Sequence, residues 1–305
     1  MGLNIMSKEI APHVHQLQIG FVNTYAITLP GGDWVLADSA IKVGLPLVKG
    51  LEKEFGRPPL AIVLTHGHWD HSSNAYTLAE QWGVKIYIHP REKPYLTGDE
   101  RYPPLDPTVG GALGFMSRFF PWPEYDFSDR LEMIPDTGEL PFLPGWKAIE
   151  TPGHTVGHIS LWNAETKTLI AGDALCTADF DKWPGATLQK PQQIVRPATP
   201  ATPDWEAAKS SVQKLADLEP LTVAAGHGQP MSGGDIAGDL RYLAENFELP
   251  EHGRYVPTPA TYAPDGTLIA LPSPVKDPLG LGLIAGAGAL LTAGLVSIVR
   301  SRRSD

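Results

Sequence analysis

The sequence is almost without cysteine and has no surplus of positive charge. Cys176 is the only cysteine among 305 residues, so an intramolecular disulfide is excluded and nothing requires an oxidising compartment. Lysine and arginine number 24 against 34 aspartates and glutamates, which gives a formal net charge of −10 at pH 7. Binding to nucleic acid needs a basic surface that displaces counterions from phosphates, so we expect no nucleic-acid partner.

The composition is otherwise that of a globular protein. Hydrophobic residues make up 42% of the chain, and 31 glycines with 30 prolines indicate many turns and loops. This composition excludes a collagen, a coiled coil and a wholly disordered chain. The N-terminal residues lack the basic start and the apolar stretch of a secretory signal, so we expect the catalytic part to stay in the cytoplasm.

An uncharged stretch lies near the C-terminus, at residues 279–299. As a helix it would be about 31 Å long, close to the hydrocarbon thickness of a bilayer. We expect a transmembrane helix here that makes the protein membrane-associated, with a proline-rich linker at 251–278 before it and a basic tail at 300–305 after it. The alternative is a glycine- and alanine-rich soluble helix or tail.

The order of expected elements predicts the fold class. Short β-rich runs come first, and strand–helix units follow twice over. Apolar residues recur at helical spacing in four segments, 47–55, 73–82, 204–217 and 234–248. This order favours an α/β (α+β) chain in which two mixed β-sheets pack together with helices outside. We expect one catalytic domain over residues 1–250.

Three histidines and an aspartate lie within THGHWDH at 65–71, directly after the apolar run at 61–64. Burying such side chains is costly unless they have partners, and imidazole with carboxylate is a good ligand set for borderline metals. Three further candidates, each with a glycine beside it, follow other strand-like runs: His154, Asp173 and His227. Because each lies where a strand gives way to a turn, each could project one ligand onto a common rim.

With these motifs the chain resembles the metallo-β-lactamase fold superfamily over roughly residues 10–250, near the glyoxalase II-like hydrolases. The resemblance implies an αββα sandwich with a dinuclear metal site at one edge, to which this chain adds its apolar C-terminal segment. The resemblance implies that the first metal is bound by His66, His68 and His154. The second metal would be bound by Asp70, His71 and His227, and Asp173 would bridge the two metals.

The resemblance also implies the chemistry. Two divalent metal ions, most simply Zn²⁺ with Mn or Fe as alternatives, would lower the pKa of a bridging water, and the resulting hydroxide would attack an ester, thioester or lactone. Asp70 would be catalytic as the proton shuttle to the leaving group. Asp38 matches a position that supports a ligand histidine through a hydrogen bond. The partner is then a small-molecule substrate, and the oligomeric state stays open.

Departures from relatives narrow these expectations. Only about 20 residues separate His227 from the proline-rich segment, too few for the helical domain with which glyoxalase II holds glutathione. The alternative function is an iron-dependent redox enzyme on the same fold, persulfide dioxygenase-like or diiron oxygen-reducing. Such relatives keep fewer ligands at the second metal or carry a flavin domain, which counts against this alternative.

The aromatic segment 98–128 interrupts the strand–helix pattern. One interpretation is an apolar lid in which Phe119 and Trp122 contact the substrate, and the other is that these rings simply pack onto the sandwich. We expect His158 to be a structural group beside the ligands and Cys176 to be a small buried hydrophobe.

Overall fold

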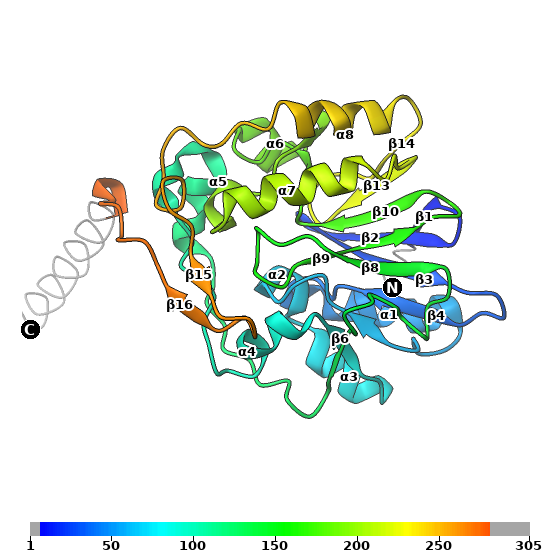
Figure 1. Ribbon diagram of the computed structural model, residues 1–305. Helices are drawn as coiled ribbons and strands as arrows, with labels where there is room; N and C mark the ends of the chain where they lie inside the picture. The colour runs from blue at the N-terminus through cyan, green and yellow to red at the C-terminus, as the bar shows by residue number, and fades with distance from the viewer. Residues whose placement is uncertain (1–6, 281–305) are drawn as a thin grey trace, which may run out of the picture. The chain divides into compact units, whose positions relative to one another are not determined.

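Two β-sheets stack face to face, and helices cover the outer face of each (Figure 1). This computed structural model describes residues 7–280. Of these, residues 7–272 belong to one compact unit, which carries the candidate site, and a second unit begins at Ser273.

In the described part of the chain, the first sheet has seven strands, which lie side by side in chain order. The pairs from the first to the fourth strand are antiparallel, and the pairs from the fourth to the seventh are parallel. The strands are β1 (Lys8–Ala11), β2 (Val14–Ile19), β3 (Val22–Thr28), β4 (Trp34–Ala37), β5 (Ile62–Val63), β6 (Ile86–Ile88) and β7 (Leu131–Met133).

The second sheet has five strands over the same described residues, in the order β14-β13-β10-β9-β8. They are β8 (Trp146–Glu150), β9 (Ile159–Asn163), β10 (Thr168–Gly172), β13 (Thr222–Ala225) and β14 (Met231–Ser232). Its β10–β13 pair is parallel and the others are antiparallel, so both sheets are mixed. Two further two-stranded sheets pair β11 (Cys176–Ala178) with β12 (Gln192–Val195) and β15 (Thr261–Tyr262) with β16 (Leu268–Ala270), all antiparallel.

Helices connect the strands and cover both sheets (Figure 1). The α-helices are α1 (Leu45–Phe55), α2 (Trp69–Ser72), α3 (Ala75–Trp82), α4 (Lys93–Leu96), α5 (Gly111–Met116), α6 (Trp183–Leu188), α7 (Trp205–Ala216) and α8 (Ile236–Glu245). Short 3₁₀ helices are η1 (Lys42–Gly44), η2 (Pro90–Glu92), η3 (Pro107–Val109), η4 (Ser117–Phe119) and η5 (Thr199–Ala201). Helix α7 lies where the 204–217 periodicity predicts it, and the side chain of Asp204 caps it by accepting a hydrogen bond from Ala207 N at 2.9 Å.

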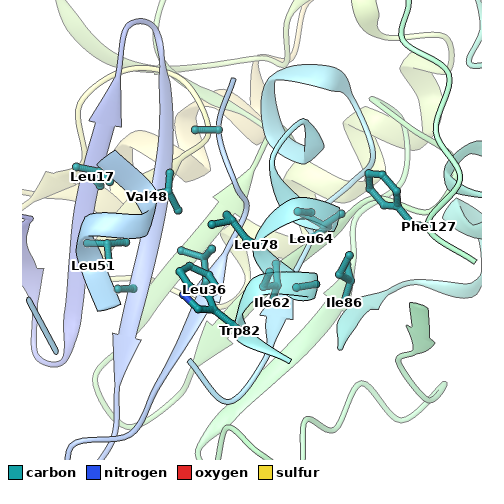
Figure 2. Close-up of a cluster of buried hydrophobic side chains, with 14 of the residues drawn as sticks. Leu17, Leu36, Val48, Leu51, Ile62, Leu64, Leu78, Trp82, Ile86 and Phe127 are labelled. Atoms are coloured by element: carbon teal, nitrogen blue, oxygen red, sulfur yellow. The ribbon is translucent and has the colours of Figure 1, made fainter. Parts of the chain in front are cut away.

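Three apolar layers hold the sandwich together. Side chains alternate between the two sides of a strand, so in β4 Leu36 faces α1 and α3 while Val35 faces the other sheet. Figure 2 shows the outer layer of the first sheet, where Leu36 and Ile62 lie near Leu78 of α3. Each such leucine or isoleucine contributes about 1.5–3 kcal/mol by its burial. The expected fold of two mixed sheets flanked by helices is confirmed.

The predicted membrane association needs correction. Among residues 7–280 no helix is both long enough and apolar enough to cross a membrane. Most of the stretch at 279–299, and the basic tail at 300–305, lie outside the described residues. The C-terminal transmembrane helix, the membrane as a partner and the membrane-associated localisation are therefore withdrawn.

Much of the proline-rich segment is folded, although its composition suggested a linker from residue 251. Tyr255 is buried and its hydroxyl donates to Pro104 O at 2.6 Å. The turn between β15 and β16 lies against α4, because the hydroxyl of Tyr95 donates to Gly266 O at 2.7 Å (Figure 1). The compact unit consequently runs to Pro272, beyond the boundary at 250 that the sequence suggested.

Candidate metal centre

The histidines and aspartates that the sequence singled out lie together where strands of both sheets end. Three overlapping groups have ligand atoms within 4.8 Å of one another: His66, His68 and His154; His66, His71 and Asp173; and Asp70, His71 and His227. The first of these is called group one below, and the last is called group two. The chain between β5 and α2 supplies His66 and His68, and α2 supplies Asp70 and His71. The loops after β8, β10 and β13 bring the other three side chains to the same place.

Asp173 lies between the two groups. Its Oδ2 atom is 3.4 Å from Nε2 of His154 and 3.1 Å from Nε2 of His227. Its Oδ1 atom is 3.5 Å from Nε2 of His71. Within the groups, Nδ1 of His68 is 2.9 Å from Nε2 of His154. One carboxylate therefore contacts side chains of both groups, as a bridging ligand must.

Some buried polar atoms of the cluster have no hydrogen-bond partner among the described residues. Within the described residues, His66 Nε2, His154 Nδ1 and Asp173 Oδ1 are buried and have no hydrogen-bond partner. Each such atom costs about 1–3 kcal/mol when nothing compensates it. Imidazole nitrogens and carboxylate oxygens, with no thiolate, suit Zn²⁺, Mn²⁺ and Fe²⁺. The residues therefore fit a binuclear metal site, and they do not select one metal.

The three histidines of group one are uncharged. Burial lowers the pKa of His66 and of His154 well below the usual histidine range, and it lowers the pKa of His68 to about 4. A neutral imidazole keeps the lone pair with which it binds a cation. This group is therefore ready to bind metal near neutral pH without losing a proton.

Group two behaves differently because it contains carboxylates. Burial favours a neutral His71, but Asp173, Asp38 and Asp70 outweigh it and raise the pKa of His71 well above the usual range. The same competition raises the pKa of His227 to about 10, and His71 and His227 lower the pKa of Asp70 to about 2 despite its burial. A cation that binds here has to displace protons, so its affinity depends on pH.

Two neighbours orient the ligands of group two. Asp38 Oδ2 is 2.9 Å from Nδ1 of His71, and Asp38 Oδ1 accepts from Thr65 N at 2.8 Å. This is the contact that the resemblance implied for Asp38. The Nδ1 atom of His227 lies 2.9 Å from Phe21 O, which directs Nε2 of that ring toward the cluster.

His158 holds Asp173 in place. The backbone N–H of Asp173 donates to Nε2 of His158 at 2.9 Å, and Nδ1 of that ring is 2.8 Å from Thr151 Oγ1. Burial lowers the pKa of His158 to about 3, so the ring is neutral and accepts this bond. Gly172 is required beside it, because a Cβ atom there would lie 2.7 Å from His158 Nε2. His158 therefore supports a ligand from behind.

A cavity of about 620 Å³ opens over the candidate metal ligands. About half of the residues that line it come from 97–126, which we call the substrate segment. Aromatic side chains form much of its wall, namely Phe21, Trp69, Tyr95, Tyr102, Phe120, Trp122, Tyr125 and Phe180. Of the two rings expected to contact substrate, Trp122 lines this cavity and Phe119 does not. The Phe119 side chain is 66% exposed and packs against Phe115. Cys176 is buried at the cavity wall, and burial raises the pKa of its thiol.

Sequence reasoning missed two residues beside the ligands. Glu92 is buried behind the cluster and Tyr102 packs edge-on against His68, with ring centroids 4.7 Å apart. Neither belongs to a recognisable motif, and Glu92 stands in PREKPYL, where its charge suggests a solvent-exposed turn. Only the tertiary contacts identify them.

Comparison with known proteins gives the family. The model of the metallo-beta-lactamase superfamily matches residues 17–227. The chain is similar to probable metallo-hydrolase YflN of Bacillus subtilis (strain 168), with 41% identity over 78% of this chain and 92% of that one. It is also similar to uncharacterized protein YobT of the same organism, with 30% identity over 68% and 83%.

Among solved structures, TTHA1623 in a di-iron-bound form has 25% identity and a TM-score of 0.52, covering 76% of this chain and 98% of that one. This structure is similar in fold to the present chain. The matched family region, residues 17–227, also contains every candidate ligand from His66 to His227. The chain belongs to the metallo-beta-lactamase superfamily.

Proposed function

We propose that this protein is a hydrolase that uses two divalent metal ions to cleave an ester, thioester or lactone with an apolar acyl part. The observation that carries the proposal is the cavity, whose aromatic walls end on His68, Asp70, His154, Asp173 and His227. Such a cavity buries an apolar chain and presents its polar carbonyl to the ligands. We assign the chain to the glyoxalase II-like branch because its bridging position is an aspartate and its ligand set has no cysteine.

The residues divide the work. His66, His68 and His154 would hold one ion, and group two would hold the other, with Asp173 between them. Bound there, two divalent ions supply Lewis acidity and lower the pKa of a water molecule to near neutrality. Zn²⁺ is the simplest choice. The same donors suit manganese and iron, and the TTHA1623 structure, described as di-iron-bound, makes iron a reasonable second candidate.

Asp70 is the group that can move a proton. Its carboxylate lines the cavity, its side chain is 13% exposed, and its Oδ2 atom is 3.4 Å from His227 Nε2. From there it can accept a proton from the attacking water and deliver it to the leaving group. Phe120 and Trp122 line the apolar part of the cavity, where they would exclude water from the reacting carbonyl.

Charges at the cavity lining narrow the substrate class further. Glu100, Glu124 and Asp126 line the cavity, and Arg101, the one lysine or arginine among the described lining residues, forms an ion pair with Glu124. This lining repels an anionic leaving group. Two like charges about 10 Å apart repel by about 0.4 kcal/mol in water before salt screening, and coenzyme A carries several charges. We therefore propose an uncharged leaving group.

A matched pair of thioesters tests the function. Octanoyl-N-acetylcysteamine and octanoyl-coenzyme A share their acyl chain and thioester, and they differ in the charge of the leaving group. With metal-quantified protein, we expect kcat/KM to be about tenfold higher for the neutral thioester, because of the repulsion at the lining. High salt and Glu124→Gln should each reduce the difference in kcat/KM between the two thioesters. A phenyl ester and a lactone of equal chain length complete the panel.

Two results would contradict the proposal. Protein with two bound ions that hydrolyses none of these compounds is not this kind of hydrolase. Protein purified with iron that consumes oxygen or a persulfide, and leaves the panel intact, would instead support the redox alternative.

The substrate segment offers a second test with an internal control. Trp122→Ala should raise KM for the neutral octanoyl thioester about tenfold, because the lost ring contact is worth about 1.5 kcal/mol of apolar burial. Phe119→Ala removes a similar ring at the last residue of η4, outside the cavity lining, so its KM should stay near that of the unchanged protein. Equal KM values for the two variants would show that the Trp122 ring does not contact the substrate.

A further inference from the structure

Glu92 is a buried carboxylate that the chemistry above does not use. It ends η2 between β6 and α4, and only 1% of its surface is exposed. Its Oε1 atom accepts from Thr155 Oγ1 at 2.7 Å and from Gly157 N at 2.8 Å. Its Oε2 atom accepts from Gly67 N at 3.0 Å and from the hydroxyl of Tyr102. Both oxygens are thus fully hydrogen-bonded.

Three of these four donors, from Gly67, Thr155 and Gly157, lie on the two loops that carry group one. Gly67 stands between His66 and His68, and Gly157 lies in the loop 151–158, which carries His154. The two loops belong to different sheets, one after β5 and the other between β8 and β9. The carboxylate of Glu92 is therefore a direct connection between the segments that must meet around one metal ion.

The two loops are built to approach this carboxylate closely. A Cβ atom at Gly157 would lie 2.9 Å from Glu92 Oε1, and one at Gly67 would lie 3.0 Å from Leu96 Cδ2 and would collide with the hydroxyl of Tyr102. Any larger residue would push the backbone N–H away from the acceptor. Both hydrogen bonds consequently depend on glycine.

Burying the charged carboxylate of Glu92 lowers the stability of the fold unless its hydrogen bonds compensate the cost. Within the described residues Glu92 has no ion-pair partner, and a buried carboxylate without one is destabilising unless its hydrogen bonds compensate it. An apolar side chain could fill the space without that cost. The negative charge is useful where four N–H and O–H donors have to be held in one arrangement next to a cation site.

We propose that Glu92 is a positioning residue for the first metal: it fixes the His66–His68 loop against the His154 loop so that three imidazoles converge. The inference rests on the proposed dinuclear centre and does not depend on which substrate is hydrolysed. Group two has its own supports, Asp38 and Phe21 O, so the effect of Glu92 is specific to the first metal.

Glutamine is a precise probe of this role. Its side chain keeps the size of glutamate but has one acceptor oxygen and one NH₂ donor. In either orientation, the NH₂ group faces a backbone N–H, that of Gly67 or that of Gly157, and an N–H cannot turn round to accept. Glu92→Gln therefore releases one of the two loops, whichever way the amide points.

Metal binding by full-length variants with a single remaining site tests the proposal. His227→Ala leaves group one complete, and His68→Ala leaves group two complete. Adding Glu92→Gln to the His227→Ala protein should weaken Co²⁺ binding about 10- to 100-fold and alter the visible spectrum of the bound ion, as is usual for lost support of a ligand. Adding Glu92→Gln to the His68→Ala protein should change neither the affinity for Co²⁺ nor the visible spectrum of the bound ion.

Controls separate positioning from general destabilisation. Glu52→Gln alters a glutamate on α1 that accepts from Trp82 Nε1 at 2.8 Å, and it should leave Co²⁺ binding unchanged. Tyr102→Phe removes one donor and keeps both loop bonds, so it should weaken binding by less than Glu92→Gln, and it serves as the probe if the glutamine variant does not fold. Unchanged binding in the His227→Ala background, or equal weakening in both backgrounds, overturns the proposal. Because the test measures Co²⁺ binding, a lack of hydrolase activity would not contradict the proposed role of Glu92.

Discussion

Replacing Asp70 with asparagine should lower kcat at least about a hundredfold when variant and unchanged protein are compared at equal metal content. Asparagine keeps the size and one ligand oxygen, but it carries no charge and cannot accept a proton at neutral pH. General acid–base catalysis of this kind contributes about 10²- to 10⁴-fold. The low pKa of Asp70, about 2, keeps the side chain ionised at working pH, so the substitution removes a charge that is present.

The measurement has to separate proton transfer from metal loss. Both proteins are loaded with Zn²⁺, their metal content is determined, and kcat is measured with the octanoyl thioester. Asp136→Asn makes the same chemical change at an exposed position and should leave kcat unaltered. A kcat of Asp70→Asn close to that of the unchanged protein, at equal occupancy, would remove Asp70 from the catalytic step.

Asp173→Ala should have the second large effect, through metal content. The Asp173 carboxylate contacts His154, His71 and His227, so its loss weakens both groups at once. We expect bound metal to fall from close to two ions per chain to about one or fewer. Because metal ions supply several kcal/mol of transition-state stabilisation, kcat/KM should fall roughly a thousandfold.

Metal analysis by mass spectrometry and the thioester assay check this result, with Asp136→Ala as the matched exposed control. Circular dichroism shows whether the fold survives, and Asp173→Asn, which keeps the shape of the side chain, is the second variant. An Asp173→Ala protein that retains two tightly bound ions would mean that Asp173 is not shared between them.

The candidate ligands could be picked out in the sequence because their signal is local. His66, His68, Asp70 and His71 lie within six residues of one another, and the remaining three follow apolar strands that a short window reveals. Parallel strands end on the same side of a sheet, so strand-end residues converge once the sheets pack. The order of strand-like and helical segments likewise predicted two packed sheets with helices outside.

Other features depend on contacts between residues that lie far apart in the sequence. Glu92 takes its donors from residues 10 to 65 positions away, and its own neighbours in sequence are charged or proline. Trp122 lines the cavity and Phe119, at the end of η4, does not, and the weak periodicity of this segment could not distinguish the two rings. The proline content of residues 251–278 pointed to a linker, whereas Tyr255 is buried and hydrogen-bonded to Pro104 O, and Gly266 O accepts from Tyr95.

The floor of the cavity is formed by strand ends, whereas much of its wall is formed by a surface connection. This difference has an evolutionary consequence. The metal-binding floor of the cavity is built from strand ends of both sheets, where a displaced residue disturbs the whole sandwich. Much of its wall comes from the substrate segment, which crosses the surface between β6 and β7. Surface connections tolerate insertion and exchange. Descendants of one ancestor can therefore acquire new substrates by remodelling this segment while the hydrolytic centre is inherited intact. Tyr102 is the exception, because its hydrogen bond to Glu92 links the substrate segment to the loops that carry group one.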